Sequence, residues 1–152
     1  MLAEIRTAEQ KLGFQLPGFL RDLYLHVGNG GFGPRVLGLD NGWQDGCQHD
    51  TAIGHYLDNQ AMCVRWMPEK WYLLEKFLPI AYGGCTIYYL LDCNSEDGAV
   101  LQWNAAGLEE HPARKIVAAS LREWLEQWLD DKIHQREVYG ISPGIDFDEI
   151  PF

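Results

Sequence analysis

A glycine-rich segment at residues 27–34 restricts the fold of this chain more than any other feature. Its residues Gly28, Gly30 and Gly33 match the spacing G-x-G-x-x-G of a dinucleotide-binding loop. Such a loop leaves a strand and opens a helix, so that backbone amides and the helix N-terminus face the phosphates. Here the order is reversed, because a helical pattern precedes the glycines and Pro34 prevents a new helix from running through them.

The residues before the glycines predict a helix that the glycine-rich segment ends. Pro17 stands at the first helical position, and apolar residues follow at spacings of three and four, namely Phe19, Leu20, Leu23 and Val27. Asn29, Gly30 and Gly31 adopt positive φ at little cost, as a left-handed C-cap requires. We therefore interpret the segment as a helix end followed by a turn, in preference to a nucleotide site.

Length and composition predict one globular domain. A chain of 152 residues with 47% hydrophobic residues buries enough surface to fold without disulfides or metal. No apolar run reaches the length of a membrane span, and the first residues lack a secretory signal. The four cysteines match no disulfide or zinc framework in their spacing. We expect a cytoplasmic protein with reduced thiols, and an irregular acidic tail over residues 136–152.

The remaining pattern predicts an α+β fold, with a mostly antiparallel central sheet and helices packed around it. A first helix uses Leu2, Ile5 and Leu12 as its apolar side and stops at Gly13. Residues 77–82, 85–92 and 98–103 are β-rich runs joined by turn sequences, which is typical of an antiparallel meander. The second run is apolar on both faces, so we expect it to be central. Shorter strands are expected at residues 36–39 and 115–118.

Two further helices are predicted from their N-terminal caps. One begins after Asp50 or Thr51 and continues to Met62. The other, at the C-terminal end, begins with the capping-box pattern of Ser120 and Glu123. Its amphipathic spacing indicates that one face packs on the sheet, with the apolar residues Leu121, Trp124, Leu125, Trp128 and Leu129.

The acidic residues are unevenly distributed along the chain. The net charge is -10, which argues against nucleic acid as a direct ligand and favours a basic partner. Residues 40–64, 92–113 and 137–152 contain acidic side chains and no Lys or Arg. Two explanations stay open, namely solubility and an acidic docking face for a basic protein. The candidate docking residues are Asp40, Asp45, Asp50, Asp92, Glu96 and Asp97.

Other residues have both a structural and a functional interpretation. Asp92 ends the central strand, where a carboxylate usually caps the following turn. Trp66 and Trp71 lie in an irregular region, and we expect burial in the core, with an exposed partner-binding anchor as the alternative.

Catalytic and metal chemistry find little support in the sequence. Cys47 and His49, with His55 and Cys63, are the best metal candidates, but they lack the paired ligand spacing of structural zinc. A nucleophile could be Cys85 or Cys93 beside one of the histidines, which only geometry could establish. We expect no catalytic residue, no metal and no cofactor.

The ordered motifs resemble the SUKH superfamily of Smi/Knr-type domains. Residues 8–17 resemble the opening "E-x-x-L-G-x-x-L-P" of that family, with Leu16 and Pro17 at its end, and Asn29, Gly30 and Gly31 resemble its "N-G-G". Further similar blocks follow in the expected order at residues 78–81, 98–103 and 119–125. The resemblance implies an α+β fold. In bacteria such domains are typically immunity proteins that neutralise polymorphic toxins, often nucleases or nucleic-acid deaminases, and other members are scaffolds or regulatory modules.

Three functional hypotheses follow from these observations. The first is a non-enzymatic immunity protein that blocks a basic toxin by stoichiometric binding. The second is a regulatory or scaffold module that binds an endogenous protein through exposed aromatic side chains such as Trp66 and Trp71. The third is a hydrolase or metal enzyme that uses Cys47, His49 or Cys85. The sequence favours the first, and it does not indicate the oligomeric state.

Overall fold

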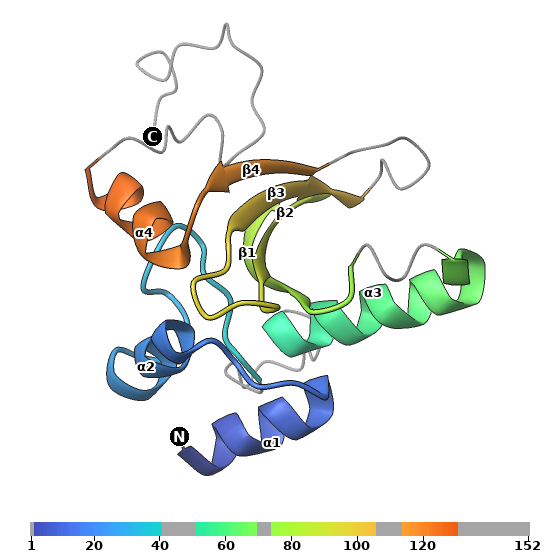
Figure 1. The fold of residues 1–152 in the computed structure, drawn as a ribbon, viewed down its shortest axis with the longest axis horizontal. Coiled ribbons are helices and arrows are strands. Elements are labelled where there is room, and N and C mark those ends of the chain that lie inside the picture. Colours follow the sequence, from blue (N-terminus) through green and yellow to red (C-terminus); the bar gives the residue numbers. More distant parts are fainter. Residues whose placement is uncertain (1, 41–50, 70–73, 106–113, 131–152) are drawn as a thin grey trace, which may run out of the picture.

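The computed structural model describes residues 2–40, 51–69, 74–105 and 114–130, and these residues form an α+β fold (Figure 1). The helices and strands follow one another as α1 (Leu2–Leu12), α2 (Gly18–His26), α3 (Ala52–Trp66), β1 (Phe77–Gly84), β2 (Ile87–Asp92), β3 (Val100–Asn104), β4 (Arg114–Ala118) and α4 (Leu121–Leu129). The predicted fold class is therefore confirmed. No helix in the described ranges combines the length and the apolar character that crossing a membrane requires. The tail predicted at residues 136–152 lies outside the described residues.

Helix α1 packs through a narrow apolar stripe. Ile5, Ala8 and Leu12 are buried, and the helix ends at Gly13, whose φ of +77° suits glycine. The predicted stripe was wrong at one position, because Leu2 is about half exposed. Leu2 begins the helix, so the core does not extend far enough to cover it.

Helix α2 begins one residue later than its sequence pattern predicted. Pro17 occupies the N-cap position with an extended ψ of 140°, and the first helical residue is Gly18. The buried residues are Leu20 and Tyr24, and Val27 is exposed after the last turn. The Tyr24 hydroxyl donates a hydrogen bond to the Leu37 carbonyl, which satisfies the polar end of a buried ring.

The glycine-rich segment forms a turn, but the left-handed cap predicted at the helix end was wrong. Val27 caps α2 in a right-handed conformation, and positive φ begins only at Gly30 and Gly31. The turn folds the chain back, so that the Asn29 side-chain oxygen accepts a hydrogen bond from the Leu39 amide at 2.7 Å. No strand precedes this turn and no helix opens directly after it in the described residues, in agreement with our interpretation of the glycine spacing.

The four strands form an antiparallel meander in the order β1-β2-β3-β4, as predicted. Two details differ from the sequence expectation. Gly83 and Gly84 belong to β1, and Cys85, with a φ of +51°, lies in the following turn. The expected strand at residues 36–39 is reduced to isolated bridges, because only Val36 and Gly38 meet strand-like partners, at Ala81 and Thr51.

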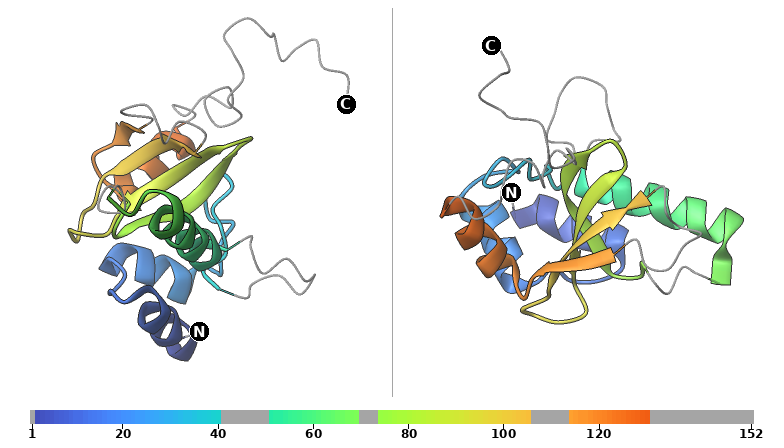
Figure 2. Two further views of the ribbon diagram at one scale, coloured as in Figure 1. Left: turned by 90° about the vertical axis from the view of Figure 1, so that its right-hand side faces the viewer. Right: turned by 90° about the horizontal axis from the view of Figure 1, so that it is seen from above.

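The central strand β2 is buried on both faces, as its sequence indicated. Tyr89 and Leu91 lie on one face in the larger hydrophobic cluster, which includes buried residues of all four helices. Leu90 lies on the other face, in a smaller cluster with Cys63, Leu74 and Trp103. The views in Figure 2 show the twisted sheet with helices on its two sides. Helix α3 contributes to both clusters, because its first half joins the larger one and Cys63 joins the smaller one.

The caps of α3 and α4 confirm the predicted helix starts. The Thr51 hydroxyl accepts a hydrogen bond from the Gly54 amide, and the Ser120 hydroxyl accepts one from the Glu123 amide. The predicted apolar face of α4 was too long. Trp124 is buried against Tyr89, with ring centroids 5.3 Å apart, whereas Trp128 is partly exposed and Leu129 is 72% exposed. Both residues lie in the last turn of α4, where the core no longer covers the helix fully.

We predict that Gly30→Ala destabilises the fold by about 2–4 kcal/mol, because Gly30 has a φ of +92° and an added Cβ would lie 2.8 Å from the Gly38 nitrogen. Gly31→Ala is the matched control. It has a φ of +71° but nothing within 4 Å of its added Cβ, so we expect a loss of only about 1 kcal/mol. Urea unfolding measures both values. Equal losses would show that the added methyl group at residue 30 does not clash with residue 38.

Candidate protein-interaction site

A compact acidic turn connects β2 to β3, and we define it as residues 92–98. The Asp92 carboxylate accepts a hydrogen bond from the Asn94 amide at 2.9 Å, which is the capping role expected for Asp92. The Asp92 amide in turn donates to the Ala99 carbonyl. Gly98 packs directly on the Asp92 backbone, where an added Cβ would overlap the carbonyl oxygen. The acidic turn therefore has little freedom to change its shape.

Glu96 attaches the acidic turn to the N-terminus of α2. Its Oε1 atom accepts a hydrogen bond from the Gly18 amide at 2.6 Å. This amide is one of the first N–H groups of α2, which have no partner inside the helix, and the positive end of the helix dipole favours a carboxylate there. Gly18 also has no side chain, and a Cβ at this position would collide with the Glu96 carboxylate. The bond fixes the place of the acidic turn on the molecular surface.

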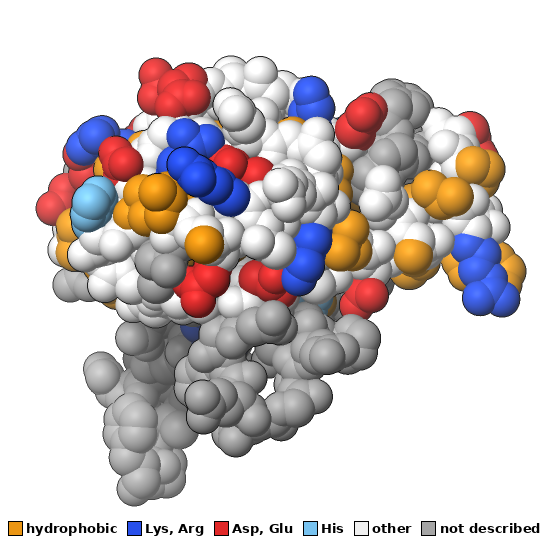
Figure 3. Space-filling view, turned by 90° about the horizontal axis from the view of Figure 1, so that it is seen from below, with side chains coloured by type: hydrophobic (Ala, Val, Ile, Leu, Met, Phe, Trp, Pro, Cys, Tyr) orange, Lys and Arg blue, Asp and Glu red, His pale blue; other side chains and the backbone are white. Residues whose placement is uncertain are grey.

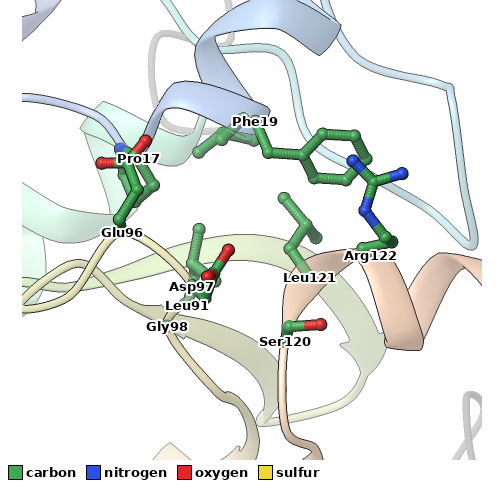
Figure 4. A pocket seen from close by; sticks show the side chains of 10 residues that line it. Pro17, Phe19, Leu91, Glu96, Asp97, Gly98, Ser120, Leu121 and Arg122 are labelled. Carbon is green, nitrogen blue, oxygen red and sulfur yellow. The ribbon is translucent and has the colours of Figure 1, made fainter.

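A small crevice opens where the acidic turn meets α2 and the start of α4 (Figure 4). Its volume is about 30 Å³, which is room for a water molecule or the tip of a side chain, and less than a cofactor needs. The residues that line it come from four parts of the chain and are Pro17, Phe19, Leu20, Leu91, Glu96, Asp97, Gly98, Ser120, Leu121 and Arg122.

Opposite charges stand on the two sides of this crevice. Asp97 is exposed on the acidic turn, and Arg122 is exposed on α4. The Arg122 guanidinium lies 4.3 Å from the centroid of the Phe19 ring, a distance typical of a cation–π contact. Neither Asp97 nor Arg122 forms a salt bridge with another residue of the described ranges. Figure 4 shows Leu121 between them. The crevice therefore offers a partner an apolar centre with one free charge of each sign at its rim.

The link between α1 and α2 is held by Glu9 of α1. Its Oε1 atom accepts hydrogen bonds from the Leu16 amide at 2.9 Å and from Arg21 Nη2 at 2.6 Å. The Glu9 carboxylate thus holds the link between α1 and α2 and neutralises the Arg21 cation of α2.

The structure brings together only some of the predicted docking residues. Asp92, Glu96 and Asp97 share the acidic turn, beside Pro17 and the buried Leu16. Asp40 lies elsewhere and forms a salt bridge with Lys11 of α1. The other candidates, Asp45, Asp50 and Trp71, lie outside the described residues. A docking role for these positions remains a prediction, and Asp97 is the acid whose surroundings fit it best.

Trp66 is exposed, so the expectation that it is buried was wrong. It ends α3, and 69% of its surface is accessible to solvent. The Arg65 guanidinium lies 5.0 Å from its ring centroid. The apolar spacing of residues 53–62 could not reveal this, because the core ends at Cys63 and α3 continues one turn beyond it.

The structure bears on several of the residues considered for metal binding or nucleophilic chemistry. No three His, Cys, Asp or Glu side chains are grouped as metal ligands there, and Cys47 and His49 lie outside those ranges. Burial is the main reason that the pKa of Cys93 is raised to about 12; a backbone hydrogen bond with Leu78 lowers it and the nearby Asp92 charge raises it, both by smaller amounts. Burial also raises the pKa of Cys63. Both thiols are therefore protonated near neutral pH, which makes them poor nucleophiles.

Sequence reasoning missed the apolar and basic parts of the site. Phe19 was assigned to a helix face, and Arg122 was noted only as part of a resembling block. Their contact joins α2 to α4, which are far apart in the chain, so no local spacing could indicate it. The resemblance of residues 8–17 to "E-x-x-L-G-x-x-L-P" was the one sequence signal that drew attention to Glu9, which pairs with Arg21.

We predict that iodoacetamide at about pH 8 alkylates Cys85 much faster than Cys93 or Cys63. Cys85 is exposed in the β1–β2 turn, whereas the other two thiols are held in the unreactive protonated form by burial. A time course analysed by peptide mass spectrometry measures the three rates, with the urea-unfolded protein as the control. Equal rates for Cys93 and Cys85 in the folded protein would contradict the burial of Cys93.

Comparison with known proteins places this geometry in a family. A search of curated proteins and a search of solved structures each found no match. A family model described as the SMI1 / KNR4 family (SUKH-1) matches residues 2–127. The match runs from α1 into α4 and therefore includes the Glu9 junction, the acidic turn and every residue that lines the crevice. The chain belongs to the SMI1 / KNR4 family (SUKH-1), a family of immunity-protein-like domains.

Proposed function

We propose that this chain is an immunity protein that binds a protein toxin and neutralises it by stoichiometric association. The toxin we propose is a nuclease or nucleic-acid deaminase, whose substrate groove is basic because it holds phosphates. The observation that carries this proposal is Asp97, an exposed carboxylate at the rim of a small crevice on a chain of net charge -10. Family membership supports the same function.

The structure suits binding that needs little reorganisation. The acidic turn is held by the Asp92 cap, the close packing of Gly98 and the bond from Gly18 to Glu96. A partner therefore loses little free energy in ordering this turn when it binds. The large negative charge attracts a basic toxin over long range and accelerates association. Asp97 then pairs with a cation of the toxin, while apolar atoms fill the crevice.

We further propose that the chain acts without catalysis or a cofactor, in the cytoplasm, and without binding nucleic acid itself. Substrate pockets usually have volumes of about 300–1,000 Å³, and the crevice, at roughly a tenth of the lower value, is itself too small to hold a substrate. The raised pKa values of Cys63 and Cys93 support the same conclusion for those two thiols.

The second candidate function is a regulatory or scaffold module that binds an endogenous protein. The exposed Trp66 favours it, because aromatic side chains dominate the binding energy of many interfaces. Recognition through Trp66 would be largely apolar and would change little with salt, whereas the acidic surface predicts strong salt dependence. Binding measured at low and high salt therefore separates the two functions.

We predict that the chain protects cells against a toxin encoded beside its gene and that Asp97→Lys weakens this protection. Reversal of this charge should reduce the affinity for the toxin about tenfold, mainly through slower association. Glu126→Lys on the exposed surface of α4 is the matched control, because it changes the net charge equally but lies outside the crevice. Coexpression survival and binding kinetics measure the two effects.

The outcomes separate the function from the site. If no neighbouring toxin exists and the wild-type chain protects against none, the immunity function is wrong. If the wild-type chain protects and the two variants lose equal affinity, the function stands and the crevice is not the docking site. Unfolding curves for both variants show whether any loss of protection comes from loss of fold.

A further inference from the structure

The solvent-facing side of α3 forms a continuous stripe that the rest of the described chain does not cover. Asp58, Ala61, Met62, Arg65 and Trp66 are all exposed and recur at spacings of three and four, so they share one face of the helix. The opposite face is buried through Ile53, Tyr56 and Cys63. We call the five exposed residues the α3 stripe.

The end of this stripe is unusually apolar for a surface. The exposed fractions are 36% for Met62, 54% for the flanking Val64 and 69% for Trp66. Figure 3 shows hydrophobic side chains gathered where α3 extends from the body of the molecule, beside basic side chains. Arg65 lies over the Trp66 ring, so the two side chains form one platform. Grouped apolar side chains of this kind commonly mark an interaction surface.

The order of charges on the stripe decides which partner fits it. Asp58 stands on one side of Ala61 and Met62, and Arg65 stands on the other side, two helical turns further on. A second copy of α3 in the antiparallel direction places Asp58 of each copy opposite Arg65 of the other. The stripe is therefore complementary to itself, as a two-fold interface must be.

We propose that this protein forms a two-fold dimer in which the α3 stripes of two copies pack antiparallel. The axis passes between Ala61 and Met62, so these residues meet their counterparts at the centre. Trp66 of each copy lies just outside the Asp58–Arg65 pair and packs on the α3 helix of the other copy. The dipoles of the two antiparallel helices also attract each other. One helix pair is a small interface, so the dimer is weak and depends on concentration.

This surface is separate from the proposed toxin site. No residue that lines the crevice belongs to α3. In Figure 1, α3 projects away from the region where α2 and α4 approach each other. The dimer leaves both acidic turns accessible and does not depend on the identity or existence of a toxin.

Sedimentation equilibrium of the full chain tests the dimer. The expected mass rises with concentration from 17.4 kDa toward twice that value. Trp66→Ala should weaken association about tenfold or more, because an aromatic anchor is lost. Ile116→Ala is the matched control, since Ile116 is 65% exposed on β4 and lies outside the stripe. It should leave the dimer unchanged.

Charge reversal tests the antiparallel geometry itself. Asp58→Arg and Arg65→Asp each place like charges opposite one another, so each variant should be monomeric at concentrations where the wild type is a dimer. The double variant Asp58→Arg/Arg65→Asp restores both opposite pairs and should restore the dimer. A mixture of the two single variants should form a heterodimer for the same reason.

Three results would overturn the proposal. They are a wild-type mass of 17.4 kDa at all concentrations up to about 1 mM, a dimer that persists in Trp66→Ala, and a double variant that folds and stays monomeric. Circular dichroism spectra check the fold of each variant. If Asp58→Arg alters the fold, Arg65→Asp and Trp66→Ala still decide the result, because both lie in the exposed last turn of α3.

Discussion

The burial of β2 on both faces is the constraint on which the rest of this structure depends. Tyr89 and Leu91 must be covered on one side and Leu90 on the other, so helices have to pack on both sides of the sheet. Trp124 of α4 covers Tyr89, and α3 extends along β1 into the smaller cluster. Because β2 is central, its end at Asp92 emerges between helices, and the acidic turn has α2 and α4 as neighbours.

The acidic turn acquires its properties from that position. An exposed loop of acidic residues would ordinarily sample many shapes, but here Glu96 accepts a hydrogen bond from the N-terminus of α2. Glu9 in turn fixes the link between α1 and α2. These two carboxylates are used for structure, as is Asp92, which leaves Asp97 as the acid on this turn available to a partner. The number of acidic residues is therefore larger than the number of acidic side chains that are available to a partner.

Two surfaces of different chemistry result from this arrangement. The crevice combines Asp97 and Arg122 with an apolar floor, and its preformed shape suits a charged partner that arrives by electrostatic attraction. The α3 stripe combines Met62 and Trp66 with a charge on each side of its centre, and that order suits a second copy of the same helix. The proposed toxin contact and the proposed self-association therefore use separate parts of the fold and can vary independently.

The sequence by itself determined the local structure, because helix caps, turns and alternating strands depend on neighbouring residues. Thr51 and Ser120 marked two helix starts, and the apolar run to Asp92 marked the central strand. Only the tertiary structure decided which apolar residues are buried in the core and which acidic side chains form hydrogen bonds or salt bridges. Trp66 is exposed because α3 outlasts the core, and Glu96 is bound because α2 lies beside it. Burial and partners depend on segments distant in the chain, and local spacing carries no information about those contacts.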